Sequence, residues 1–302
     1  MTRTLHARRH QRPGRQDAAK SGRRERIMKK YVIPIAFVAG AVIALSVLLY
    51  PAAANRISSR SQSRIVTEYI EEVAAVDDGR RQAALEAARE YNTRLLLKTD
   101  RFKFTQEETA EYKKQLDVGK DVMGILLIDK IDVKLPIYHG TNEAVLDVGI
   151  GHLQGSSLPV GGTGTHAVIT GHRGLPSSKL LSNLDAMAEG DTFALYVMGE
   201  TLTYQVDQIK VVLPSEAEAL SIDREMDYCT LVTCTPYGVN THRLLVRGRR
   251  VESALVGIMA PDAKPLGKPA IILSFIALIS PVLLLCLIVR CVKIHQKGRV
   301  HR

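Results

Sequence analysis

Three residues whose side chains could act together in catalysis lie at the ends of apolar runs in this chain. Cys234 ends one run, the turn-forming residues 235–240 follow, and Arg243 lies at the start of the next run. His172 directly follows a third run and has Gly171 before it. A thiolate is a strong nucleophile, a nearby arginine favours the thiolate over the thiol, and histidine exchanges protons near neutral pH. These residue types predict nucleophilic catalysis, provided that the fold brings the three side chains together.

Positive charge is concentrated at the two ends of the chain. The 302 residues carry a formal net charge of +10, to which residues 1–30 contribute +9 and residues 290–302 contribute +5. Residues 31–289 therefore carry about −4. Nucleic-acid binding needs a basic surface on the folded part of a protein, so this distribution argues against nucleic acid as a partner.

Two uncharged apolar runs, residues 31–50 and 269–289, lie just inside the basic ends. At about 1.5 Å per residue each run is long enough to cross the roughly 30 Å hydrocarbon layer of a membrane. A signal peptide cleaved near the small residues 52–54 is the alternative for the first run, although its apolar core is longer than usual. Basic flanks stay in the cytoplasm, so two spans place both termini inside the cell and residues 55–265 outside.

Two of the four cysteines, Cys229 and Cys234, fall in the exported part. Both lie in one predicted strand, where five steps of about 3.3 Å separate their Cα atoms by roughly 16 Å. A disulfide needs a separation of less than about 7 Å, so these two cysteines cannot pair with each other. An unpaired thiol in an oxidising compartment suggests a chemical role for at least one of them.

Residues 55–120 have the spacing of helices. Apolar residues recur three and four positions apart, as in Val66, Tyr69 and Val73, and the pattern breaks at residues 77–79. This region predicts a helical extension that leads into the next domain.

Residues 121–252 have the pattern of a mainly β domain. Short runs rich in Val, Ile, Leu and Thr alternate with turn residues, and one helix is predicted at about 178–187. Strands are predicted at 122–129, 133–138, 166–170, 192–198, 201–212, 229–234 and 242–248. So many short strands in one domain predict a closed barrel of seven or eight strands.

The predicted organisation has a barrel between two membrane spans. In chain order the parts are a basic tail (1–30), a transmembrane helix (31–50), a helical extension (55–120), the catalytic barrel (121–252), a linker (253–268), a second transmembrane helix (269–289) and a second basic tail (290–302).

Two segments around the reactive residues resemble the signature sequences of sortases, and specifically of the class C enzymes that assemble pili. These segments are TLVTCTPYGVNTHRLLVRG at 230–248 and THAVITGHRGLP at 165–176. The resemblance implies a sortase-like closed barrel in which Cys234 is the nucleophile, His172 is the general acid and base, and Arg243 binds the substrate carbonyl and its oxyanion. It implies no cofactor and no metal.

The resemblance also implies a reaction and its partners. The cysteine attacks the bond between threonine and glycine in an LPxTG-type sorting signal and forms a thioacyl-enzyme, while the histidine protonates the leaving amine. In class C enzymes a lysine of another pilin then takes the acyl group, so that pilins are polymerised. Thr233, next to the nucleophile, is a candidate for the substrate pocket.

Class C sortases also resemble one another in a lid, an Asp-Pro-aromatic loop over the active site. In residues 99–105 of this chain, Asp100 and Phe102 fit that pattern, but Arg101 replaces the proline. The resemblance implies that the aspartate faces Arg243 and that the aromatic ring covers the nucleophile. The alternative is a solvated turn after a helix, since a proline that would stiffen the loop is missing.

Other functions stay open at this point. A sortase of another class would attach proteins to a cell-wall peptide, and a membrane-bound cysteine protease would release the acyl group to water. A catalytically silent scaffold is the alternative outside enzymes. It fits poorly because the cysteine, histidine and arginine are all present.

Overall fold

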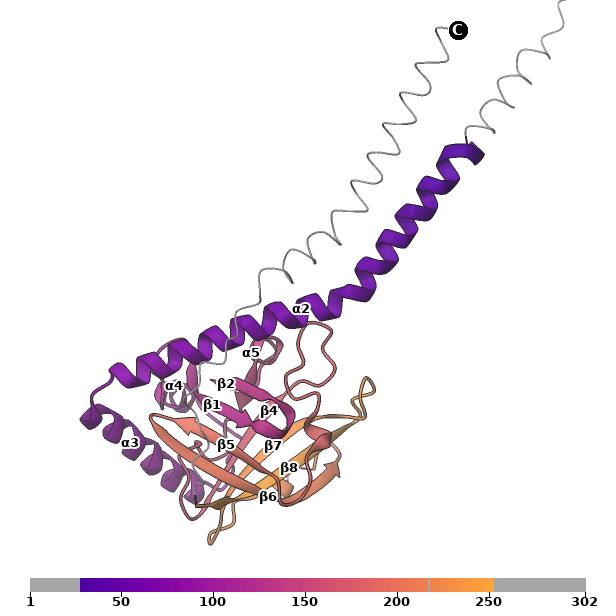
Figure 1. Ribbon diagram of the computed structural model, residues 1–302. Coiled ribbons are helices and arrows are strands. Elements are labelled where there is room, and N and C mark those ends of the chain that lie inside the picture. The colour runs from indigo at the N-terminus through magenta and orange to yellow at the C-terminus, as the bar shows by residue number, and fades with distance from the viewer. Residues whose placement is uncertain (1–27, 217, 253–302) are drawn as a thin grey trace, which may run out of the picture. The chain divides into compact units, whose positions relative to one another are not determined.

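The computed structural model describes residues 28–216 and 218–252 (Figure 1). The described residues fall into two units, of which the first ends at Leu49 and the second begins at Tyr50. The predicted linker at 253–268, the second apolar run and the second basic tail lie outside the described residues, as does most of the first basic tail.

The first apolar run is helical. A π-helical turn, Met28–Val32, leads into helix α2 (Ile33–Ala75). Within the described residues this is one helix long and apolar enough to cross a membrane. The composition and helical form expected for residues 31–50 are therefore present, whereas the two-span topology stays a prediction.

Within the described residues, eight strands close into a barrel, in the order β1-β2-β3-β4-β7-β8-β6-β5. Neighbouring strands are antiparallel except for the parallel pairs β2–β3 and β4–β7. The strands are β1 (Val122–Ile128), β2 (Val133–His139), β3 (Ile150–His152), β4 (Thr165–Gly171), β5 (Thr192–Val197), β6 (Glu200–Val212), β7 (Asp227–Thr235) and β8 (His242–Val251). The prediction of a mainly β closed barrel is confirmed, and only the short β3 was not predicted.

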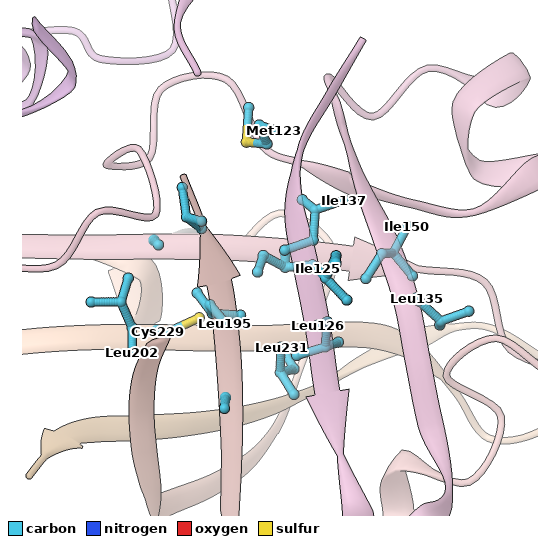
Figure 2. Close-up of a cluster of buried hydrophobic side chains, with 14 of the residues drawn as sticks. Met123, Ile125, Leu126, Leu135, Ile137, Ile150, Leu195, Leu202, Cys229 and Leu231 are labelled. Atoms are coloured by element: carbon cyan, nitrogen blue, oxygen red, sulfur yellow. The ribbon is translucent and has the colours of Figure 1, made fainter. Parts of the chain in front are cut away.

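The barrel interior is filled by aliphatic side chains from most of the strands (Figure 2). Strand β7 shows how one strand serves two faces, because successive side chains point to opposite sides of a sheet. Cys229 and Leu231 lie in this core, whereas Val232 belongs to a second apolar cluster. Burial raises the pKa of the Cys229 thiol well above its ordinary value, so Cys229 stays protonated and unreactive.

The part of α2 that belongs to the barrel unit packs through the predicted apolar positions. Val66, Tyr69 and Val73 are buried. The Tyr69 hydroxyl donates to the Met123 carbonyl at 3.0 Å and accepts the Met198 N–H at 3.2 Å. These bonds attach the helix to the backbone of the barrel at the start of β1 and just after the end of β5.

Helix α3 (Asp78–Leu97) begins at the predicted break. Asp77 caps it by accepting the N–H of Arg80 at 3.0 Å. The buried Asn92 amide then bonds the backbone of Leu158 twice, at 3.0 and 2.6 Å. This pair of bonds fixes the helix against the loop between β3 and β4.

Helix α4 (Gln106–Lys114) places Tyr112 beside a buried histidine. The Tyr112 hydroxyl lies 2.9 Å from Nδ1 of His152, and Nε2 of that ring lies 2.8 Å from the Ser157 carbonyl. A carbonyl only accepts, so Nε2 carries a proton and donates it to the Ser157 carbonyl. Burial lowers the pKa of His152 to about 4, which fits a structural role.

The helix predicted at about 178–187 is wrong. Only a single 3-10 turn forms there, Leu184–Ala186. The Lys179 N–H donates to Oδ1 of Asn55 on α2 at 2.7 Å, so a tertiary contact with α2 holds this segment. A short helix that was not predicted, α5 (Glu143–Val148), forms instead between β2 and β3.

Candidate active site

Cys234 and Arg243 are brought together by the pairing of β7 with β8. Their Cα atoms are direct partners in the antiparallel register. Both residues are partly exposed, and the Cys234 thiol is free. Two residues before Cys234, the side chain of Val232 lies in the second apolar cluster, so alternation places the thiol on that outer face of the sheet. The nucleophile predicted from the sequence is therefore accessible and lies opposite the predicted arginine.

His172 reaches the same end of the barrel because β4 runs parallel to β7. Thr170 pairs with Val232, so the residues that follow each strand leave the sheet side by side. The buried Thr233 hydroxyl donates to the Gly171 carbonyl at 2.8 Å and joins the two strand ends. His172 is the next residue and is partly exposed. The three predicted residues thus come from three strand ends at one rim.

The bond from Thr233 also gives that residue a defined place. Its hydroxyl is used inside the protein, and its side chain is only 1% exposed. A contribution of Thr233 to the substrate pocket through its hydroxyl is not supported, and a contribution through its backbone stays a prediction.

The ion pair expected between Asp100 and Arg243 is not formed. Oδ2 of Asp100 lies 2.6 Å from the Lys103 ammonium, which lowers the pKa of the Asp100 carboxyl. Nη1 of Arg243 instead donates to the carbonyls of Asn240 and His242, at 3.2 and 3.1 Å. Asp100 pairs with Lys103 and not with Arg243 because Lys103 lies only three residues along the chain. This pair forms without bringing distant parts of the chain together.

The loop 99–105 nevertheless lies on the barrel. Arg101 donates from Nη1 to the Gly155 carbonyl at 3.0 Å and from Nη2 to the Leu220 carbonyl at 3.3 Å. Phe102 packs on Gly155, where a Cβ would come within 2.7 Å of the ring. The resemblance to a proline-containing lid did not predict this role of Arg101. The planar guanidinium of Arg101 can donate to two acceptors at once.

An apolar patch lies on the same outer face of the barrel as Cys234. It is the second apolar cluster, made by Val168 on β4, Val232 on β7 and Leu245 on β8, with Leu153, Val212, Ala219 and Leu220 packed against it. Leu220 is also the residue whose carbonyl accepts from Arg101. We call these seven residues the outer apolar cluster. It runs from the reactive cysteine toward the loop 99–105.

His166 forms hydrogen bonds that link the segments around this cluster. Its Nδ1 lies 2.8 Å from the Ser221 carbonyl and its Nε2 lies 2.7 Å from the Thr230 hydroxyl, so the neutral ring donates to the first and accepts from the second. Burial lowers the pKa of His166 to about 4. The imidazole therefore ties the loop between β6 and β7 to β4 and β7 and is not available for catalysis.

The described residues contain no group of three or more His, Cys, Asp or Glu side chains that could hold a metal ion. The strand ends bring a thiol, an imidazole and a guanidinium to one rim of the closed eight-stranded barrel. Residues of these types could together carry out cysteine-dependent acyl transfer.

Comparisons with known proteins give the family. Residues 126–251 match the family described as "Sortase domain". Sortase C1 from Streptococcus agalactiae is 48% identical, with a TM-score of 0.62, and the match covers 63% of this chain and 99% of that one. Sortase C from Streptococcus pneumoniae is 43% identical, with a TM-score of 0.58 and coverages of 63% and 97%. The chain belongs to the sortase family.

The curated relatives match over shorter segments. Sortase D of Bacillus subtilis (strain 168) is 29% identical over 131 residues, which are 42% of this chain. The match spans 63% of that protein, less than two thirds of its length. The structural matches to class C enzymes are thus the more extensive of the two kinds.

Proposed function

We propose that this protein is a transpeptidase that cleaves an LPxTG-type sorting signal between threonine and glycine and transfers the acyl group to a lysine of a pilin. The single observation that carries this proposal is the direct pairing of Cys234 with Arg243 across β7 and β8. The similarity to class C sortases over nearly their whole length supports the choice of pilin as substrate.

In the first half of the reaction, the Cys234 thiolate attacks the threonine carbonyl of the sorting signal. A bond forms between Sγ and the carbonyl carbon, and negative charge develops on the oxygen. Of the nitrogens of the Arg243 side chain, only Nη1 makes hydrogen bonds to the described residues. Nε and Nη2 are therefore free to donate to that oxyanion. Such a donor typically supplies about 3–4 kcal/mol of transition-state stabilisation.

The collapse of the tetrahedral intermediate breaks the bond between the carbonyl carbon and the glycine nitrogen. The leaving amine needs a proton, which His172 donates as general acid. In the second half, His172 accepts a proton from the attacking lysine amine while the acyl group leaves Sγ. The isopeptide product forms, and the Cys234 thiolate and the protonated His172 imidazole are regenerated.

The outer apolar cluster supports a sorting signal as the substrate. Its side chains come from β4, β7 and β8 and lie on the face that carries the thiol. The leucine and proline of the signal are apolar. The central residues Val168, Val232 and Leu245 are buried, so the segments packed over them must move before the signal can be buried there, at about 25 cal/mol per Å² of apolar surface. The carbonyl to be cleaved would then extend toward Cys234.

The loop 99–105 fits a lid in this proposal. Arg101 fastens it to Gly155 and to Leu220, which is itself a member of the outer apolar cluster. The lid would therefore occupy the path of the signal, with Asp100 and Phe102 at its tip. A cover over Cys234 by Phe102 itself stays a prediction.

The proposed location is the cell membrane, with the barrel outside. Helix α2 supplies one segment able to cross a membrane. The run at 269–289 would supply the second, with both basic ends in the cytoplasm.

Attachment of proteins to a cell-wall peptide is the second candidate, since one matched relative is a sortase D rather than a class C enzyme. Mass spectrometry of the products separates the two. The purified full chain is incubated with a pilin that carries a sorting signal and with a separate cell-wall peptide amine. Pilin–pilin isopeptides support the proposal, whereas pilin joined only to the wall peptide supports the second candidate. Free carboxylate alone would show a protease.

A further inference from the structure

Arg173, the residue after His172, has little of its side chain exposed, although arginine side chains are mostly exposed in proteins. Its side chain is only 9% exposed. Nη2 forms an ion pair with Asp185, and Nη1 donates to the Thr235 hydroxyl at 3.3 Å. The guanidinium carbon also lies 5.8 Å from the centre of the Tyr237 ring. Three separate contacts hold this one side chain.

The contacts of Arg173 belong to the segment that follows Cys234 and to one turn elsewhere in the chain. Thr235 is the residue after Cys234, and Tyr237 lies in the loop between β7 and β8. Asp185 lies in the 3-10 turn Leu184–Ala186. One guanidinium therefore joins the segment that carries the histidine to the strand that carries the cysteine.

The backbone around His172 is held on both sides as well. The Gly171 carbonyl accepts from Thr233 at 2.8 Å, and the Gly174 N–H donates to Oγ of Ser182 at 3.1 Å. Gly174 has φ +80, and a Cβ there would lie 3.3 Å from the Tyr237 ring. Glycine is needed at that position both for its conformation and for the close approach of the ring.

The His172 ring itself has no hydrogen-bond partner in the part of the chain that the structure describes. In many nucleophile–histidine pairs a third side chain bonds the imidazole and orients it. Here the backbone is held instead, through the residue next to the imidazole.

We propose that Arg173 is a positioning residue that fixes the main chain of His172, so that the imidazole reaches the leaving amine nitrogen. Its charge is already paired with Asp185, whereas Arg243 has no acidic partner among the described residues. Arg243 therefore serves the oxyanion and Arg173 serves the histidine. This inference rests on the proposed function and adds a residue to it.

A comparison of two leaving groups isolates the role of His172. In a peptide with the natural amide, the amine nitrogen must receive a proton as the C–N bond breaks. In the matching peptide thioester, Sγ forms the same bond to carbon, but the leaving thiolate departs without a proton. A misplaced imidazole should therefore slow the amide and spare the thioester.

The test uses the full chain in detergent, with an LPxTG peptide as amide and as thioester. Arg173→Ala should lower kcat for the amide about 10²-fold, as expected for a displaced general acid, and should change kcat for the thioester less than about 3-fold. Arg173→Lys, which keeps a charge but loses the fork, should give an intermediate amide rate. Asp185→Asn removes the ion pair of Arg173 but leaves the hydrogen bond from Arg173 to Thr235 in place. This variant should give a smaller loss in the same direction.

Arg247→Ala is the matched control. Arg247 is also ion-paired, to Asp207 at 2.9 Å, and stacked on an aromatic ring, Tyr228 at 4.0 Å, but it belongs to β8 away from the three reactive residues. Its loss should lower the melting temperature and leave the ratio of amide to thioester rates unchanged.

The outcomes separate the two levels of the proposal. His172→Ala should show the same selective loss on the amide as Arg173→Ala. If Arg173→Ala slows both substrates equally, or neither, while His172→Ala remains selective, then Arg173 does not position the histidine. If the wild-type chain cleaves neither peptide, the proposed function is wrong, and the inference about Arg173 with it.

Discussion

Cys234 on β7 and Arg243 on β8 are direct partners across an antiparallel pair, on the rim where β4 also ends. A slip of one residue in this register would turn one of the two side chains to the opposite face. The neighbouring pairs Val232–Leu245 and Thr233–Leu244 hold the register. Val232 and Leu245 belong to the outer apolar cluster, whereas Thr233 and Leu244 are buried on the other face of the sheet. The packing of two apolar faces thus fixes the geometry of two polar groups.

Arg243→Lys should lower kcat for the sorting-signal peptide about 10²-fold or more, since one point charge replaces a fork that can donate from two nitrogens. KM should change less than kcat, because the oxyanion develops only in the transition state. Steady-state kinetics measure both. Arg249→Lys is the control, since Arg249 lies on the same strand and is exposed. Equal, small effects of both substitutions would make Arg243 a structural residue.

Thiol labelling should distinguish the two cysteines of the barrel. Cys229 is fully buried and its thiol pKa is raised, whereas Cys234 is partly exposed. A maleimide at neutral pH should label Cys234 in the native protein, and Cys229 should react only after unfolding. The same selectivity should hold for the thioacyl adduct formed from a sorting-signal peptide. An adduct on Cys229, located by mass spectrometry of peptides, would remove Cys234 as nucleophile.

The structure changes which residue of the lid should be mutated. Asp100 pairs with Lys103 on its own loop, whereas Arg101 bonds the barrel twice. Arg101→Ala should therefore free the loop and speed the labelling of Cys234 by a thiol reagent several-fold. Asp100→Ala is the matched variant and should change the labelling rate little. Faster labelling in Asp100→Ala than in Arg101→Ala would mean that the loop is held through its acidic residue.

Much of this site could be predicted from the sequence because each reactive residue lies at a strand end. Apolar runs at strand spacing located seven of the strands, and helical spacing located α3 and the part of α2 that follows the first apolar run. Strand β3 was missed because its three residues, Ile150–His152, are too few to show alternation. The 178–187 helix was wrong because contacts with α2, such as the bond from Lys179 to Asn55, are tertiary and leave no local signal.

Side-chain partners were harder to predict than strands. The pairing of Asp100 with Arg243 was expected from a family pattern, but a lysine three residues along the chain takes that carboxylate. A positioning role for Arg173 could not be predicted, because its partners Asp185 and Thr235 lie 12 and 62 residues away. Such contacts depend on how the strands pair, and the spacing of residue types along the chain does not predict that pairing.

Acid should destabilise the folded protein through its buried histidines. His152 and His166 have folded-state pKa values of about 4, below the value of about 6.5 expected after unfolding. The unfolded chain therefore binds more protons, so the stability that each neutral ring contributes is complete above pH 6.5 and is lost as the pH falls toward 4. Each ring should account for roughly 3 kcal/mol over that range, at about 1.4 kcal/mol per pKa unit.

Denaturant unfolding of the full chain in detergent between pH 7 and pH 4.5 measures this loss. His166→Gln offers the sharpest test, because the amide can still donate to the Ser221 carbonyl but cannot titrate. The variant should lose about half of the pH dependence that the two histidines cause, and its unfolding midpoint should fall less steeply below pH 6.5. A slope equal to that of the wild type would show that the acid sensitivity arises elsewhere and that the ring at 166 is not kept neutral by the fold.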